Sequence, residues 1–162
     1  MYVRDIMTKP VATCSPETNL AAAVEILWNR DCGALPIVDS EHKVVGVITD
    51  RDICIALGTR NCLPSQITAA DISSGQIVIC KAGEDLRNAL AMMAEARVRR
   101  LVVIDSEGKP EGILSIDDVV RRFETGSFKK DSGLSPIDFV NFLRRVYAPQ
   151  RNLEIKHSIA AA

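Results

Sequence analysis

A chain of 162 residues, 47% hydrophobic and 25% charged, has the length and composition of one compact globular domain or of two small halves packed together. Its formal net charge of −1 gives no general attraction to nucleic acids or anionic membranes. No apolar run reaches the roughly 18 residues of a membrane span, and the N-terminus lacks the apolar core of a signal peptide. We therefore expect a cytoplasmic protein with neither a membrane nor a nucleic-acid partner.

The five cysteines and two histidines do not form the pattern of a metal site or a disulfide framework, because the cysteine number is odd and no C-x-x-C pair occurs. Cys14 and Cys80 are expected to be small buried side chains. No Ser-His-Asp set and no glycine-rich phosphate loop can be assembled. We expect no metal, no catalytic cofactor and no enzyme activity.

The chain contains an internal repeat with an offset of 66 residues. Residues 5–54 align with residues 71–120 without a gap, and twelve of the 50 aligned pairs are identical. Most other pairs exchange similar residues, such as Val for Ile or Thr for Ser. Because a repeat is one structural unit copied, the two copies should have the same elements and pack about a pseudo-two-fold axis.

In chain order, the apolar pattern of the first copy predicts a strand, a helix, a hairpin and a second helix. The expected elements are a strand at 11–14, a helix that starts near 15–18 and ends at Gly33, strands at 34–38 and 44–48, and a helix at 50–57 that Gly58 stops. Trp28 falls on the predicted core side of the first helix, so we expect it to pack rather than to contact a ligand.

The second copy predicts the same order after a connector with a short helix near 66–70: a strand at 77–80, a helix at 84–97, strands at 101–104 and 112–114, and a helix at 116–123. We divide the chain into a first repeat at 3–58, a connector at 59–69, a second repeat at 70–123, and a linker, helix and tail at 124–162. The expected class is mixed α/β (α+β), with a small, mostly antiparallel three-stranded sheet and two helices in each repeat.

The last helix is predicted to begin at Ser135 and Pro136, which are typical of a capped first turn. Its expected apolar side carries Ile137, Val140, Leu143, Val146 and Tyr147. We favour a helix packed on the repeat pair or its dimer. A docking helix for another protein is the alternative.

One motif ends the hairpin of each copy, at residues 46–52 and 112–118: a glycine, two apolar residues, Thr or Ser, two variable residues and Asp. Two interpretations remain open. Thr-x-x-Asp and Ser-x-x-Asp are capping boxes, which satisfy the first N–H groups of a helix without any ligand. The same hydroxyl, carboxylate and free N–H groups also suit a nucleotide.

These motifs, the order of the elements and the paired phrases at 34–39 and 100–105 resemble a tandem pair of cystathionine-β-synthase (CBS) domains, the Bateman module. The resemblance covers residues 3 to 123, including the opening residues 5–11. It implies a stand-alone regulatory module whose cleft binds an adenosine-containing ligand, most often AMP, ADP or ATP, and in some members S-adenosylmethionine or NAD(H). It also implies a homodimer and a regulated partner protein.

For such a ligand, the ribose candidates are Asp52 with Thr49 and Asp118 with Ser115, because one carboxylate can accept hydrogen bonds from two adjacent hydroxyls. The phosphate candidates are Arg51, Arg99 and Arg100, since guanidinium groups bind phosphate bidentately.

By resemblance, the segment before each first strand lines the adenine slot and crosses to the carboxylate of the other repeat. The residues concerned are Thr8, Pro10 and Val11 beside Ser115 and Asp118, and Ser74, Ile77 and Val78 beside Thr49 and Asp52. The first repeat has Gly33 and Ala34 where the second has the arginine pair, so the two clefts should differ.

Two other functions remain open. The pair could be a ligand-free dimerisation or interaction scaffold in which both motifs are only caps. Nucleic-acid binding would require one shared face for seven arginines: Arg97, Arg99, Arg100, Arg121, Arg122, Arg144 and Arg145.

Overall fold

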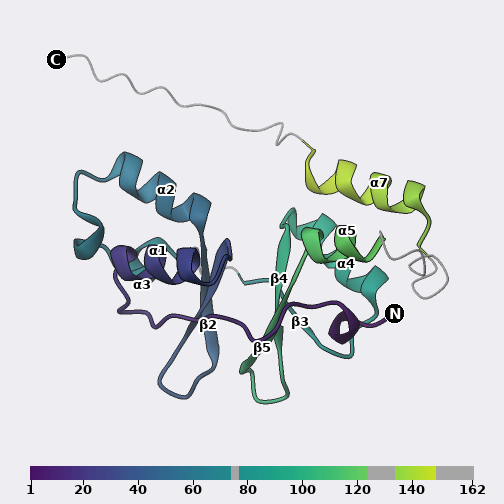
Figure 1. The fold of residues 1–162 in the computed structure, drawn as a ribbon, viewed down its shortest axis with the longest axis horizontal. Coiled ribbons are helices and arrows are strands. Elements are labelled where there is room, and N and C mark those ends of the chain that lie inside the picture. Colours follow the sequence, from purple (N-terminus) through teal and green to yellow (C-terminus); the bar gives the residue numbers. More distant parts are fainter. Residues whose placement is uncertain (74–76, 124–133, 149–162) are drawn as a thin grey trace, which may run out of the picture.

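The computed structural model describes residues 1–73, 77–123 and 134–148, which form two similar halves lying side by side (Figure 1). The first half contains α1 (Leu20–Asn29), β1 (Ala34–Val38), β2 (Val44–Thr49), α2 (Asp50–Thr59), a 3-10 turn (Pro64–Gln66) and α3 (Ala69–Ile72). The second half contains β3 (Ile79–Lys81), α4 (Leu86–Ala96), β4 (Arg100–Ile104), β5 (Pro110–Ser115) and α5 (Ile116–Phe123), and α7 (Pro136–Val146) follows. The predicted order of elements is confirmed except for the first strand.

The hairpins of the two halves share one hydrogen-bond register, which supports the repeat. Ala34 pairs with Thr49 in the antiparallel β1–β2 pair, and Arg100 pairs with Ser115 in β4–β5. In each hairpin the register shifts between the last two residues of the first strand. Because side chains alternate across a strand, equivalent residues of the two hairpins face equivalent sides.

The first strand differs between the halves. β3 pairs in parallel with β4, whereas the strand predicted at 11–14 is reduced to a single bridge between Cys14 and β1. In the second half the Val102 N–H donates to the Val78 carbonyl at 3.2 Å. The counterpart of Val102 is Pro36, which has no N–H to donate. The first sheet therefore keeps two strands rather than the expected three.

The helices that precede the hairpins both end at a residue with left-handed backbone. These residues are Asp31 after α1, with φ 47°, and Arg97 after α4, with φ 54°, and they are counterparts in the repeat. At its other end α1 is capped by the side chain of Asn19, so the start predicted near 15–18 is wrong. α2 includes Gly58, so this glycine does not stop the helix.

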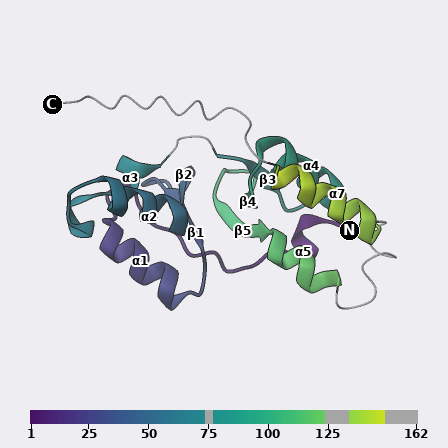
Figure 2. The same ribbon diagram turned by 90° about the horizontal axis from the view of Figure 1, so that it is seen from above.

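Two segments cross between the halves. Residues 1–8, which include a 3-10 turn at Val3–Asp5, pack on the second half, and Val3 and Met7 belong to its hydrophobic core. Ile67, from the connector, belongs to the core of the first half. Figures 1 and 2 accordingly show the N-terminus among the elements of the second half. Each half is thus completed by a segment that precedes or follows it in the chain.

The glycine of each motif admits a crossing segment. Thr8 exchanges two backbone hydrogen bonds with Ile113, at 2.8 and 3.1 Å. A Cβ on Gly112 would stand 2.9 Å from the Thr8 carbonyl oxygen, and a Cβ on Gly46 would stand 2.6 Å from the Ser73 hydroxyl. A side chain at Gly112 would meet the backbone of the crossing segment, and one at Gly46 would meet the side chains of Ser73 and Ile37, which explains glycine within these strands.

α7 packs on α4 through an aromatic face (Figure 2). Phe139, Phe142 and Val146 are buried, and the two rings stack with their centroids 5.6 Å apart. The predicted apolar side is wrong at three exposed residues, Ile137, Val140 and Tyr147. The stripe at 139, 142 and 146 is buried because aromatic rings cover the largest apolar area at helical spacing. The described part of α7 therefore packs on the repeat module, as expected.

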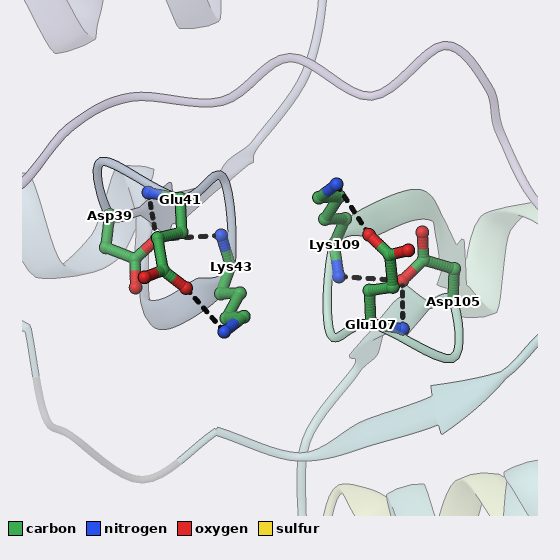
Figure 3. A network of polar contacts seen from close by, with 6 residues as sticks. All are labelled: Asp39, Glu41, Lys43, Asp105, Glu107 and Lys109. Atoms are coloured by element: carbon green, nitrogen blue, oxygen red, sulfur yellow. Dashed lines mark hydrogen bonds and ion pairs between the residues drawn. The ribbon is translucent and has the colours of Figure 1, made fainter.

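The two hairpin loops lie next to each other and are built alike (Figure 3). In each, an aspartate accepts the N–H groups two and four residues on, at 2.9 and 2.9 Å for Asp39 and at 2.8 and 2.9 Å for Asp105. These backbone bonds, chiefly that from Lys109, lower the pKa of Asp105. The Val44 N–H donates to the Gly108 carbonyl at 3.0 Å and joins the two loops.

His42 and Gly108 hold the same position in these loops, with left-handed backbone at φ 65° and 84°. Because a Cβ is disfavoured there, we expect His42→Gly to raise the free energy of unfolding by about 0.5–1 kcal/mol, measured by urea denaturation. The matched change Gly108→Ala should lower it by a similar amount. A stabilising Gly108→Ala would contradict this account.

Phe142→Ala should lower the free energy of unfolding by about 3 kcal/mol, because it leaves a cavity between α7 and α4. Ile137→Ala, on the exposed side of the same helix, should change it by less than about 0.5 kcal/mol. Denaturant titration of both variants checks the pair. Equal losses would show that α7 packs through a different face.

Candidate functional site

A cavity of about 480 Å³ lies where the second motif meets the first half. The crossing segment contributes Thr8, Pro10, Val11 and Ala12, and the first half contributes residues 30–34, up to the start of β1. The second half contributes Arg100, Ile113, Ser115, Asp117, Asp118 and Arg121. Its volume is in the range of small-molecule sites, and both halves form its wall.

The carboxylate of Asp118 is held by a residue of the second half and one of the N-terminal crossing segment. One oxygen, Oδ2, accepts the backbone N–H of Ser115 at 2.8 Å and its hydroxyl at 2.6 Å. The other, Oδ1, accepts the hydroxyl of Thr8 at 2.9 Å, and Thr8 belongs to the crossing segment. Two carboxylate oxygens have about four acceptor sites and three are used here, so one acceptor site remains for a ligand hydroxyl. The predicted grouping of Thr8 with Ser115 and Asp118 agrees with this geometry.

Arg100 reaches from β4 to the first half. A Cβ on Gly33 would stand 2.7 Å from Nη2 of Arg100 and 3.1 Å from a carboxylate oxygen of Asp50. The arginine therefore lies over Gly33, which has no side chain to displace it. Arg99, in the bend before β4, is exposed and does not line the cavity. Of the predicted arginine pair, only Arg100 is at this site.

The first motif has the same local geometry but lies outside this cavity. Asp52 Oδ2 accepts the N–H of Thr49 at 2.9 Å and its hydroxyl at 2.7 Å. Neither residue lines the cavity, and nor does the exposed Arg51. The remaining candidates of this cleft are Ile77 and Val78, which are half-buried, and Ser74, which lies outside the described residues.

The same box also caps helices away from the motifs. Asp71 accepts the N–H and hydroxyl of Thr68, and Asp138 does the same with Ser135. The hydrogen bonds lower the pKa of both aspartates. The box alone therefore does not identify a ligand site, and the additional bond from Thr8 distinguishes Asp118.

Several cavity residues were not among the predicted site residues. Arg30, Asp31 and Cys32 follow α1, and Arg121 lies in the last turn of α5. Asp117 also lines the cavity, together with Asp118. Residues 30–33 could have been found from the repeat, because they are the counterparts of residues 96–99.

Trp28 is 84% exposed, so its predicted core position is wrong. It lies on α1 beside a second hollow of about 450 Å³, which Val24, Asp50 and Ile53 also line. The buried positions of α1 are Leu20, Ala23 and Leu27, and a step from 27 to 28 turns the side chain about 100° away from that face. Adjacent apolar residues near the end of a helix do not all face the core.

The buried thiols suit packing rather than nucleophilic chemistry. Burial raises the pKa of both Cys14 and Cys80 to about 11. Burial also raises the pKa of Cys32, although a backbone hydrogen bond at Ala34 and the charge of Arg100 oppose it. Within residues 1–73, 77–123 and 134–148, no three His, Cys, Asp or Glu side chains are grouped to hold a metal. No helix in these ranges is long and apolar enough to cross a membrane.

The family model for the CBS domain matches residues 3–59 and 69–125, the two repeats. This chain belongs to the CBS domain family. Hypoxic response protein 1 of Mycobacterium tuberculosis is 34% identical over 118 residues, which cover 73% of this chain and 82% of that protein. The crystal structure of the CBS domain pair of protein MJ0100, in complex with 5′-methylthioadenosine and S-adenosyl-L-methionine, has a TM-score of 0.70, is 27% identical and covers 78% of this chain and 98% of that one. The predicted tandem CBS pair and its mixed α/β class are confirmed.

The CBS pair also matches part of an enzyme. Inosine-5′-monophosphate dehydrogenase of Methanocaldococcus jannaschii is 30% identical over 119 residues, but these span only 23% of that enzyme. The match therefore concerns a minor part of its length.

Proposed function

We propose that this CBS pair binds an adenosine-containing nucleotide, AMP, ADP or ATP, in the cavity beside Asp118. In this proposal it is a sensor without catalytic activity that regulates a partner protein. The observation that carries the proposal is that Thr8, from the N-terminal crossing segment, and Ser115, from the second motif, hold one carboxylate on the wall of an open cavity. The adenosyl ligands of the MJ0100 complex support the same ligand class.

Each part of the nucleotide has a candidate partner in this cavity. Pro10 and Val11 offer an apolar wall for adenine, and Asp118 offers its remaining acceptor site for a ribose hydroxyl. Arg100, at the edge between the halves, suits the phosphate because guanidinium binds phosphate oxygens bidentately. The first motif, with Thr49, Asp52, Arg51, Arg99, Ile77, Val78 and Ser74, is a second proposed site.

A ligand in this cavity would act on the arrangement of the two halves, because residues of both line it. Binding energy would favour the arrangement in which Thr8 and Arg100 both reach the ligand. A ligand with about 100-fold preference for one arrangement shifts the balance by roughly 2.7 kcal/mol, which is enough to change how a partner docks.

A ligand-free scaffold is the second candidate function. The capping boxes at 68–71 and 135–138 favour it, since they show the same residues acting without a ligand. S-adenosylmethionine and NAD(H) remain alternative ligands of the same cavity, because both contain the adenosine ribose.

We further propose that the pair forms a homodimer through the helices of its halves. Trp28 is 84% exposed and Val24 on the same helix is 43% exposed, while Ile55 on α2 is 52% exposed. Large apolar side chains exposed together are typical of an interface. A second copy of this chain offers the same apolar helices in return, as a two-fold interface requires.

Asp118→Asn should weaken binding of AMP about 10- to 100-fold, because the charge-assisted bonds to the ribose are lost. Isothermal titration calorimetry with AMP, ADP, ATP, S-adenosylmethionine and NADH measures this effect. Asp71→Asn is the matched control, since it alters the same box at a simple cap and should leave affinity unchanged. Absence of binding by every ligand would favour the scaffold, and equal losses in both variants would indicate a folding defect.

Trp28→Ala should shift the protein from dimer to monomer in sedimentation velocity experiments, by removing the largest exposed side chain of the proposed interface. Tyr147→Ala, on the exposed side of α7, serves as the control and should leave the dimer intact. A dimer that survives Trp28→Ala but dissociates with Tyr147→Ala would place the interface at α7.

A further inference from the structure

The charged side chains of the cavity beside Asp118 balance one another. Three are arginines, Arg30, Arg100 and Arg121, and three are aspartates, Asp31, Asp117 and Asp118. Only Asp118 is required by the proposed ribose contact. Asp31 and Asp117 add two negative charges to a site that is proposed to take an anionic ligand, and they have no role in that contact.

The repeat shows which residues occupy the equivalent positions beside the other motif. The counterpart of Asp31 is Arg97, that of Gly33 is Arg99, and that of Asp117 is Arg51. The match is structural as well as sequential, because Asp31 and Arg97 share the left-handed end of a helix. The cavity beside Asp118 thus has carboxylates where the other half has guanidinium groups, while the backbone of the two is alike.

We propose that Asp31 and Asp117 make this cavity selective for adenosyl ligands of low charge, with one phosphate or none, and reject di- and triphosphates. The inference rests on the proposed function and narrows its ligand class for this site. Repulsion between like charges of a site and a wrong ligand contributes to specificity, as do favourable contacts with the right ligand.

The positions of the two carboxylates support this selectivity. Asp31 lines the cavity together with its chain neighbours Arg30 and Cys32 and with Arg100. Among the described residues, neither Asp31 nor Asp117 forms an ion pair that would neutralise it. A single phosphate can be matched by Arg100. A longer chain of phosphates would bring further negative charge into a cavity that Asp31 and Asp117 also line, and these carboxylates would repel it.

The test exchanges the charges for those of the other half. Asp31→Arg and Asp117→Arg introduce residues that the same backbone already holds as Arg97 and Arg51, so both should fold. Adenosine, AMP and ATP are titrated calorimetrically without magnesium, which would mask phosphate charge. Each titration is repeated in the Asp118→Asn background, so that only binding that depends on Asp118 is assigned to this cavity.

In the wild-type protein we expect ATP to bind this cavity at least about tenfold more weakly than AMP. The double variant should strengthen ATP binding by about tenfold and leave adenosine unchanged. Arg97→Asp, the reverse change at the other motif, is the control and should not alter the AMP-to-ATP ratio here.

Two results would overturn the inference: Asp118-dependent binding of ATP as tight as that of AMP, or an AMP-to-ATP ratio that the double variant does not change. Failure of the proposed function looks different, because then no adenosyl ligand binds at all.

Discussion

The close approach of the Thr8 backbone to Gly112 is the contact on which the two-half architecture depends. It requires a residue without a side chain at 112, because a Cβ there would stand 2.9 Å from the Thr8 carbonyl oxygen. Through this contact the N-terminal segment reaches the second half, where Val3 and Met7 complete the core. The same segment then places the Thr8 hydroxyl on Asp118. Packing and the candidate site thus have a common origin in one backbone pairing.

Much of the fold was predictable because the sequence contains the same pattern of elements twice. A single helix or hairpin pattern is ambiguous, but two aligned copies must fit the same structure. The hairpins β1–β2 and β4–β5 do have the same register. The predictions that failed depend on single residues. Pro36 has no N–H to donate to a parallel strand, so the first sheet has two strands and not three. The buried face of α7 was predicted wrongly because the predicted apolar side left out Phe139 and Phe142.

The sequence predicted the central polar residues of the candidate site but not all the residues that line the cavity. Asp118, Ser115 and Thr8 were grouped from the sequence motif and the resemblance, and they do lie within hydrogen-bonding distance. Asp31 and Arg121 come from a helix end and a helix exterior, which carry no local pattern for a ligand. Arg99 and Arg100 were equivalent in the sequence, but only Arg100, the first residue of β4, lines the cavity, whereas Arg99 lies in the exposed bend before it.

The repeat preserves the backbone and lets the charges diverge. Positions 31 and 97 share a left-handed backbone but carry opposite charges. Positions 51 and 117 both lie in the first turn of the helix that follows a hairpin, and they too carry opposite charges. Packing constrains the glycines at 46 and 112, since a Cβ at 112 would meet the Thr8 backbone and one at 46 would meet the side chains of Ser73 and Ile37. The exposed charges at the rims are free of that constraint. A duplicated scaffold can therefore offer two motifs with a similar backbone and different charge. Electrostatic interactions alone can then make the two motifs bind different ligands.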